Sequence, residues 1–167
     1  KPYYNSNYGY YFFAEKQFQY VIDKLVEDID SRQATIVLNR PEIMMSDSSD
    51  KVCTNAISFR IRENKLNMSV SMRSNDIIYG TCIDVPQFFF LREMVLMMLK
   101  QTYPQLEIGT YFHKADSLHF YERHFKMVES IFLNNEEISP INMFKIHSHH
   151  EVTSLINNKL DGLPESD

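Results

Sequence analysis

The sequence is poor in the residues that mark linkers, disulfide frameworks and nucleic-acid surfaces. Its 167 residues include four glycines and six prolines, which argues against extended low-complexity linkers. Two cysteines are too few for a disulfide framework and favour a reducing, cytoplasmic setting. The net charge of −5, with acids and bases interspersed, argues against nucleic acid as a partner. A pocket for a single phosphate needs only one or two arginines and stays open.

Long apolar runs are also missing. The richest run, residues 88–99, is too short to cross a bilayer and contains Arg92 and Glu93, so we expect no membrane partner. The chain begins at Lys1 without an initiator Met and without the layout of a signal peptide. We expect it to be a fragment or the ordered part of a longer protein. Its 44% hydrophobic and 13% aromatic content predicts a globular core.

Hydrophobic spacing predicts an α+β fold, one sheet with helices over its face. The clearest pattern is a β-hairpin, in which residues 57–61 and 66–72 alternate apolar and polar side chains around a turn at 63–65. Residues 46–51 are expected to form a polar loop. The other expected elements are helices over 14–29, 87–99, 122–132 and 150–160, a buried strand over 34–38, and one or two strands over 109–121.

Reactive and polar residues stand in a fixed order around this hairpin. Cys53 precedes its first strand, and Arg73-Ser74-Asn75-Asp76 follows its second. Asp84, the apolar helix and His119-Phe120-Tyr121 come next. A single cysteine is more often an inert small hydrophobe than a nucleophile. The whole ordered set is far less common by chance than any one member.

This order resembles the thymidylate synthase and deoxycytidylate hydroxymethylase family. In that family a cysteine is followed after twenty residues by Arg-Ser-x-Asp, then by Leu-Gly-x-Pro-Phe-Asn, a long apolar helix and His-x-Tyr. Cys53 and Arg73 are likewise twenty residues apart. Asp30-Ser31-Arg32 looks like the family's Asp-Ser-Arg-Arg, and Tyr8-Gly9 like its Tyr-Gly. We expect a thymidylate synthase-like catalytic domain over 1–135, with the family's first strand and helix missing, and a polar C-terminal extension over 136–167.

The resemblance implies that Cys53 is a covalent nucleophile. Thiolates suit reversible addition to carbon 6 of a pyrimidine, which activates carbon 5. It also implies that Arg73 and Ser74 bind the phosphate, joined by Arg32 from the partner subunit of a homodimer. The implied one-carbon donor is 5,10-methylenetetrahydrofolate, with Asp76 on its side of the site. Hydride would complete a methyl group, and water a hydroxymethyl group.

His119 and Tyr121 are implied to bind the sugar 3′-hydroxyl, since their spacing of two places both on one face of a strand. Asp84 is implied to be a catalytic residue that contacts the base. Thymidylate synthases carry Asn there, and the hydroxymethylases carry Asp. A carboxylate accepts hydrogen bonds, so it suits the amine of cytosine and predicts dCMP as the substrate. A thymidylate synthase acting on dUMP, and a solvated loop aspartate, remain the alternatives.

Several positions depart from the family pattern. The family's Pro-Cys-His is Val52-Cys53-Thr54, Cys82 replaces a proline, and the sequence has no tryptophan. A catalytically degenerate relative, kept as a nucleotide-binding or structural dimer, is therefore the alternative to an enzyme. The histidines at 147, 149 and 150 lack the partners of a metal site, so no metal is expected there.

Overall fold

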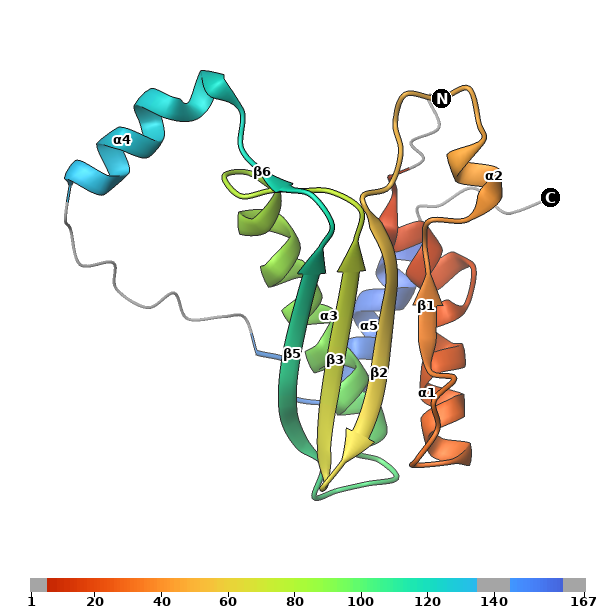
Figure 1. Cartoon of the computed structure of the whole chain (residues 1–167). Helices are drawn as coiled ribbons and strands as arrows, with labels where there is room; N and C mark the ends of the chain where they lie inside the picture. Colours follow the sequence, from red (N-terminus) through yellow and green to blue (C-terminus); the bar gives the residue numbers. More distant parts are fainter. Residues whose placement is uncertain (1–5, 135–144, 161–167) are drawn as a thin grey trace.

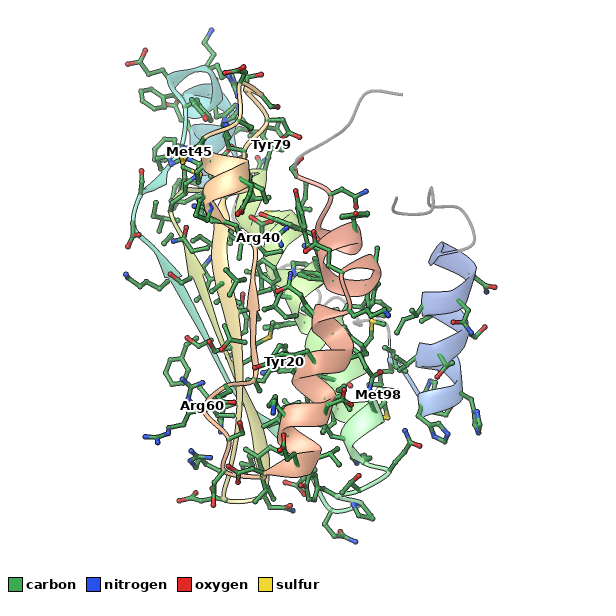
Figure 2. All side chains as sticks on the ribbon, turned by 90° about the vertical axis from the view of Figure 1, so that its right-hand side faces the viewer. Tyr20, Arg40, Met45, Arg60, Tyr79 and Met98 are labelled. Atoms are coloured by element: carbon green, nitrogen blue, oxygen red, sulfur yellow. The ribbon has the colours of Figure 1, made fainter. Side chains whose placement is uncertain are left out.

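The computed structural model describes residues 6–134 and 145–160. It contains a four-stranded sheet in the order β1-β2-β3-β5, formed by β1 (Thr35–Val37), β2 (Thr54–Arg62), β3 (Lys65–Met72) and β5 (Glu107–Ala115). Helices α1 (Gln17–Glu27) and α3 (Gly80–Leu99) cover one face of this sheet (Figure 1). Figure 2 shows α5 (His149–Leu160) lying beyond them. The expected α+β class is confirmed.

The predicted hairpin is formed by β2 and β3. The strands pair antiparallel, with Phe59 opposite Met68 and Arg62 opposite Lys65. Glu63 and Asn64 between them have φ angles of 51° and 58°. Two central residues with positive φ make the tight connection that matches the twist of hairpin strands. The inward side chains are all buried, as the alternation predicted: Ile57, Phe59, Ile61, Leu66, Met68, Val70 and Met72.

The connection from β3 to β5 determines which residues meet. The two strands are parallel neighbours, and α3 forms the crossover between them. Both strands therefore end at the same edge of the sheet, where the antiparallel β2 begins. This upper edge lies at the top of the sheet in Figure 1. Residues before β2, after β3 and after β5 come together there although they are far apart in sequence.

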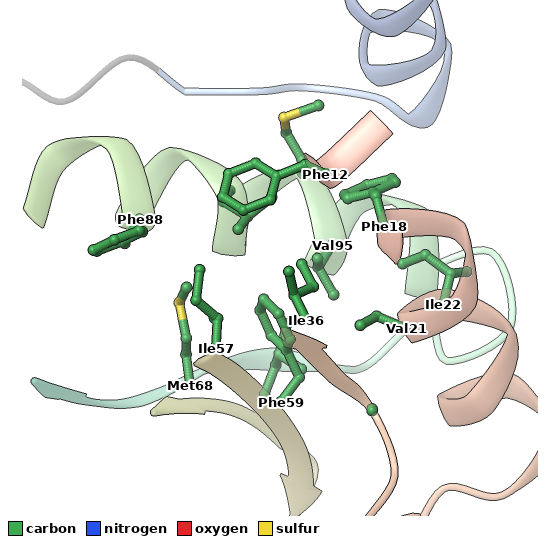
Figure 3. Packing of buried hydrophobic residues seen from close by; sticks show 14 of the residues in the cluster. Phe12, Phe18, Val21, Ile22, Ile36, Ile57, Phe59, Met68, Phe88 and Val95 are labelled. Atoms are coloured by element: carbon green, nitrogen blue, oxygen red, sulfur yellow. The ribbon is translucent and has the colours of Figure 1, made fainter. Parts of the chain in front are cut away.

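The core lies between the sheet and the helices. Figure 3 shows Phe12, Phe18, Val21 and Ile22 facing sheet residues. Val21 and Phe59 are fully buried. Burial of side chains of this size stabilises the fold by about 1.5–3 kcal/mol each. On the opposite face of the sheet, Val37 and Phe112 are 43% and 60% exposed.

Several elements differ from the sequence-based expectation. The crossover helix begins at Gly80 instead of Gln87, and Pro86 lies inside it. Elements that were not expected are the π-helix η1 (Tyr10–Ala14), the short helix α2 (Pro41–Met44) and the strand β4 (Asn75–Asp76). β4 pairs in parallel with β6 (Leu118–His119), which lies in the segment 109–121 where one or two strands were expected. A 3-10 turn, η2 (Glu122–His124), precedes α4 (Phe125–Leu133).

The C-terminal part of the described chain joins the core. Ile146 and Val152 are 3% and 0% exposed, and α5 packs against α3. The domain boundary expected between residues 135 and 136 lies outside the described residues. No helix in the described ranges is long and apolar enough to span a bilayer.

Candidate active site

Cys53 and Arg73 are neighbours at the upper edge. Cys53 lies just before β2, and its carbonyl accepts a hydrogen bond from the Arg73 backbone N–H at 2.9 Å. The Arg73 guanidinium donates from Nε to the Val52 carbonyl at 3.1 Å and from Nη2 to the Lys51 carbonyl at 3.3 Å. Its Nη1 has no hydrogen-bond partner within residues 6–134 and 145–160. The guanidinium therefore lies along the residues before the cysteine with a donor group free for an anion. Ser74 follows and is half-buried.

His119 and Tyr121 reach the same edge through the small sheet. β4 directly follows Ser74 and pairs with β6, placing Asp76 opposite His119. The rings of His119 and Tyr121 lie 5.3 Å apart at an interplanar angle of 87°. The strand ends at His119, so Tyr121 lies beyond it and not on one strand face as expected. The two rings nevertheless remain in contact.

Asp76 is close in the chain to exposed apolar residues. Its Oδ1 accepts a hydrogen bond from the backbone N–H of Ile78 at 2.9 Å. Ile77, Tyr79 and Ile83 nearby in the chain are 41%, 54% and 65% exposed. A hydrogen-bond acceptor close in the chain to exposed apolar and aromatic side chains is a combination that suits a flat heterocycle.

Asp84 lies in the second turn of α3 and is half-buried, so it is not a residue of a solvated loop. Burial raises the pKa of its carboxyl group, and a hydrogen bond from Asn75 opposes that rise. The Asn75 amide Nδ2 donates to Asp84 Oδ2 at 2.8 Å. The carboxylate is thus held at a defined position between β4 and α3.

Tyr8 is a member of this site to which sequence analysis gave no role. Its hydroxyl donates to Thr54 Oγ1 at 3.0 Å and accepts from the Thr54 backbone N–H at 3.2 Å. Burial raises the pKa of Tyr8, and the nearby Asp84 and Cys53 add to the rise, so the phenol stays protonated at neutral pH. The Tyr8-Gly9 element was the signal that pointed to it.

Tyr111 and His113 on β5 were also missed. The Tyr111 hydroxyl and His113 Nδ1 are 2.7 Å apart, and the His113 ring lies 6.4 Å from Phe88. Burial lowers the pKa of His113, which keeps it neutral. Burial raises the pKa of Tyr111, and Asp84 adds to that rise. Their alternation along β5, which turns every second side chain toward α3, was the available signal.

Arg32 does not join this group within one chain. It is exposed and shares a charged cavity with Arg62, at the far end of β2. Eight strand steps separate Thr54 from Arg62, or about 27 Å. A contribution from Arg32 would have to come from a second copy, as the resemblance implies.

The remaining reactive residues do not gather. Cys53 and Cys82 are both free thiols, and Cys82 is exposed. The rings of His149 and His150 in α5 lie 3.9 Å apart at an interplanar angle of 38°. Within the described ranges, no three His, Cys, Asp or Glu side chains are placed to hold a metal ion.

Comparison with known proteins bears on this arrangement. The family model for thymidylate synthase matches residues 12–163. A deoxycytidylate 5-hydroxymethyltransferase of Enterobacteria phage T6 is 31% identical over 134 residues, covering 75% of this chain and 54% of that protein. A deoxyuridylate hydroxymethyltransferase of Bacillus phage SP01 is 35% identical over 108 residues, covering 63% of this chain and 27% of that protein.

The fold agrees as well. The structure of thermostable thymidylate synthase A from Bacillus subtilis superposes with a TM-score of 0.62 at 24% identity, covering 74% of this chain and 42% of that one. The chain thus spans about half the length of the T6 relative and less of the other two. Because the family model covers nearly the whole sequence, the chain belongs to the thymidylate synthase family.

Proposed function

We propose that the protein transfers a one-carbon unit to carbon 5 of a pyrimidine deoxynucleotide monophosphate, with dCMP preferred. The observation that carries this proposal is the backbone hydrogen bond between Cys53 and Arg73, 2.9 Å long, which pairs these two residues across the strands, while the Arg73 guanidinium donates to the carbonyl of Val52, the residue before the cysteine. The pairing supports a site in which Cys53 would act as the nucleophile and Arg73 would bind the phosphate. The hydroxymethyltransferase names of the phage relatives support the same reaction class.

The chemistry follows from what these side chains do. The Cys53 thiolate would add to carbon 6 of the base, which makes carbon 5 nucleophilic. Arg73 and Ser74 would bind the phosphate, with Arg32 of a second copy completing that pocket. His119 and Tyr121, whose rings are in contact, would bind the sugar hydroxyl.

Asp84 and Tyr8 are the groups proposed to face the base. A carboxylate held by Asn75 would accept from the exocyclic amine of cytosine. The protonated Tyr8 phenol, hydrogen-bonded to the residue after the cysteine, would provide a proton-transfer group beside the reacting carbon atoms.

The residues present fit the implied donor, 5,10-methylenetetrahydrofolate. Asp76, with Tyr79 and Ile83 exposed nearby, would hold its ring system. When bound, the donor would supply a carbon at the oxidation level of formaldehyde. A homodimer in a soluble, cytoplasmic setting remains part of this proposal.

Tritium release from carbon 5 of labelled dCMP and dUMP, with the folate supplied, tests the proposal. We expect faster release from dCMP, and a loss of at least about a thousandfold in Cys53→Ser. Cys82→Ser is the matched control and should keep its rate. Product analysis then separates methyl from hydroxymethyl.

The SP01 relative, named for deoxyuridylate, makes dUMP the second candidate substrate. Release from dUMP alone would favour it. If neither nucleotide releases tritium yet both bind, the protein is a degenerate family member, and the enzyme proposal is wrong.

A further inference from the structure

Asn75, which holds the Asp84 carboxylate, is a buried polar residue that sequence analysis did not single out. It is 2% exposed, and its side chain forms hydrogen bonds on every side. Its Nδ2 donates to Asp84 Oδ2 at 2.8 Å and to the Met72 sulfur at 3.1 Å. Its Oδ1 accepts from the Thr81 hydroxyl. A buried amide whose groups are all used is fixed in one rotamer.

The direction of this amide is determined by its partners. A hydroxyl that donates to Oδ1 holds the carbonyl toward Thr81. Turning the amide over would place its oxygen against the Asp84 carboxylate, and two acceptors repel each other. Asn75 therefore presents an N–H group, and never a carbonyl, to an ionised Asp84.

We propose that Asn75 is a positioning residue that sets base selectivity by fixing which groups Asp84 presents to the nucleotide. The inference rests on the proposed function, in which Asp84 faces the base. With Oδ2 engaged by Asn75, Oδ1 is left to accept from a donor, and it has no partner within the described ranges. The exocyclic amine of cytosine is that donor, whereas the carbonyl of uracil is not.

The same contact explains what an amide at position 84 would do. In Asp84→Asn, the Asn75 N–H would select the carbonyl oxygen of the new side chain and leave its NH₂ group toward the base. An NH₂ group donates to the carbonyl of uracil. Asn75 thus gives residue 84 a single orientation, and the chemistry at position 84 then decides between the two bases.

The other groups around Asp84 do not replace Asn75. Tyr8 and Tyr111 lie close enough for its charge to raise their pKa values, and both phenols stay protonated. Within the described residues, no salt bridge reaches Asp84 and no second hydrogen-bond donor contacts it. Since burial raises the pKa of Asp84 and Asn75 lowers it, loss of this donor should favour the protonated acid.

The test uses variants of Asn75 and two measurements. In Asn75→Leu, the Asp84 pKa measured by ¹³C carboxyl NMR should rise, and the low-pH loss of dCMP binding should move to higher pH. The preference for dCMP over dUMP, measured by titration calorimetry, should fall by about tenfold or more. Asn67→Ala, which removes another half-buried asparagine on β3, is the control and should change neither quantity.

A reversed pair sharpens the test. The double variant Asn75→Asp with Asp84→Asn exchanges donor and acceptor across the same contact. It should turn the new amide carbonyl toward the base and restore the dCMP preference that Asp84→Asn alone has lost. A contribution of Asn75 to folding alone would not produce this reversal.

The outcomes separate the two proposals. If the unsubstituted protein shows no preference for dCMP, the proposed substrate is wrong. If that preference is present but Asn75→Leu keeps it and the Asp84 pKa is unchanged, the role of Asn75 is refuted. If Asn75→Leu does not fold, the double variant Asn75→Asp with Asp84→Asn is the test. If that double variant still prefers dUMP, as Asp84→Asn alone is expected to do, the inference is overturned.

Discussion

The contact between Tyr8 and Thr54 makes a quantitative prediction about stability. Thr54 is fully buried, and its backbone N–H donates to the Tyr8 hydroxyl, which in turn donates to Thr54 Oγ1. Tyr8→Phe leaves that N–H without an acceptor, whereas the threonine hydroxyl can rotate. A buried donor left unpaired costs about 1–3 kcal/mol, so we expect a loss of about 2–3 kcal/mol in the free energy of unfolding.

Urea denaturation measures this loss. Tyr103→Phe is the matched control, because its hydroxyl donates mainly to the Leu25 carbonyl at 2.8 Å, and it should cost about 1 kcal/mol. A double-mutant cycle with Thr54→Val isolates the contact and should give a non-additive term. Additive effects, or a Tyr8→Phe cost no larger than the control's, would refute the reasoning.

The same variant has a defined pH dependence. Burial raises the pKa of Tyr8 above its ordinary value of 10.0, so the folded state holds the proton more tightly than the unfolded chain does. The contribution of the Tyr8 hydroxyl to the free energy of unfolding is therefore complete below pH 10 and is lost as the pH rises through the folded-state pKa. The stability gap between the unsubstituted protein and Tyr8→Phe should narrow above pH 10.

Three further predictions follow from single contacts. Asp84→Asn should shift relative binding toward dUMP by about tenfold or more in titration calorimetry, and an unchanged ratio would remove Asp84 from the base site. Gly109→Ala places a Cβ 2.6 Å from Asn67 Oδ1 and 3.0 Å from the Leu66 backbone, so it should cost about 1–3 kcal/mol in urea unfolding, partly recovered by adding Asn67→Ala. Burial lowers the pKa of His113, so the contribution of the neutral ring to the free energy of unfolding is complete above pH 6.5 and is lost as the pH falls through the lower folded-state pKa. His113→Gln should therefore destabilise the protein more at pH 8 than at pH 5.

Local sequence patterns predicted the elements in which burial of one face makes apolar and polar side chains alternate. The alternation of Ile57, Phe59 and Ile61 gave the hairpin because one face packs on helices. The crossover helix was expected to begin at Gln87, yet it begins at Gly80. The first turns of the helix were not predicted because Pro86 follows them and proline usually interrupts a helix. In the structure, the contacts of Asp84 and Thr81 with Asn75 override that preference.

The order of residues in the chain identified the candidate site residues. It did not identify the residues that contact them in the structure. Nothing in local sequence links Tyr8 to Thr54, 46 residues away, or Asn75 to Asp84 across two elements. Such contacts depend on how the N-terminal segment packs on β2 and how β4 packs on α3, which period and propensity do not reveal. The roles of Cys53, Arg73 and His119 stay predictions until a nucleotide is bound.

The hydrogen bonds from the Arg73 side chain to backbone carbonyl groups have a consequence for the affinity for phosphate. A free arginine side chain loses about 2 kcal/mol of rotamer entropy when a ligand immobilises it. Here two carbonyl groups, those of Lys51 and Val52, restrain the guanidinium plane through hydrogen bonds within the chain. If Arg73 binds the phosphate as proposed, its side chain would lose little further rotamer entropy on binding, because folding has already ordered it.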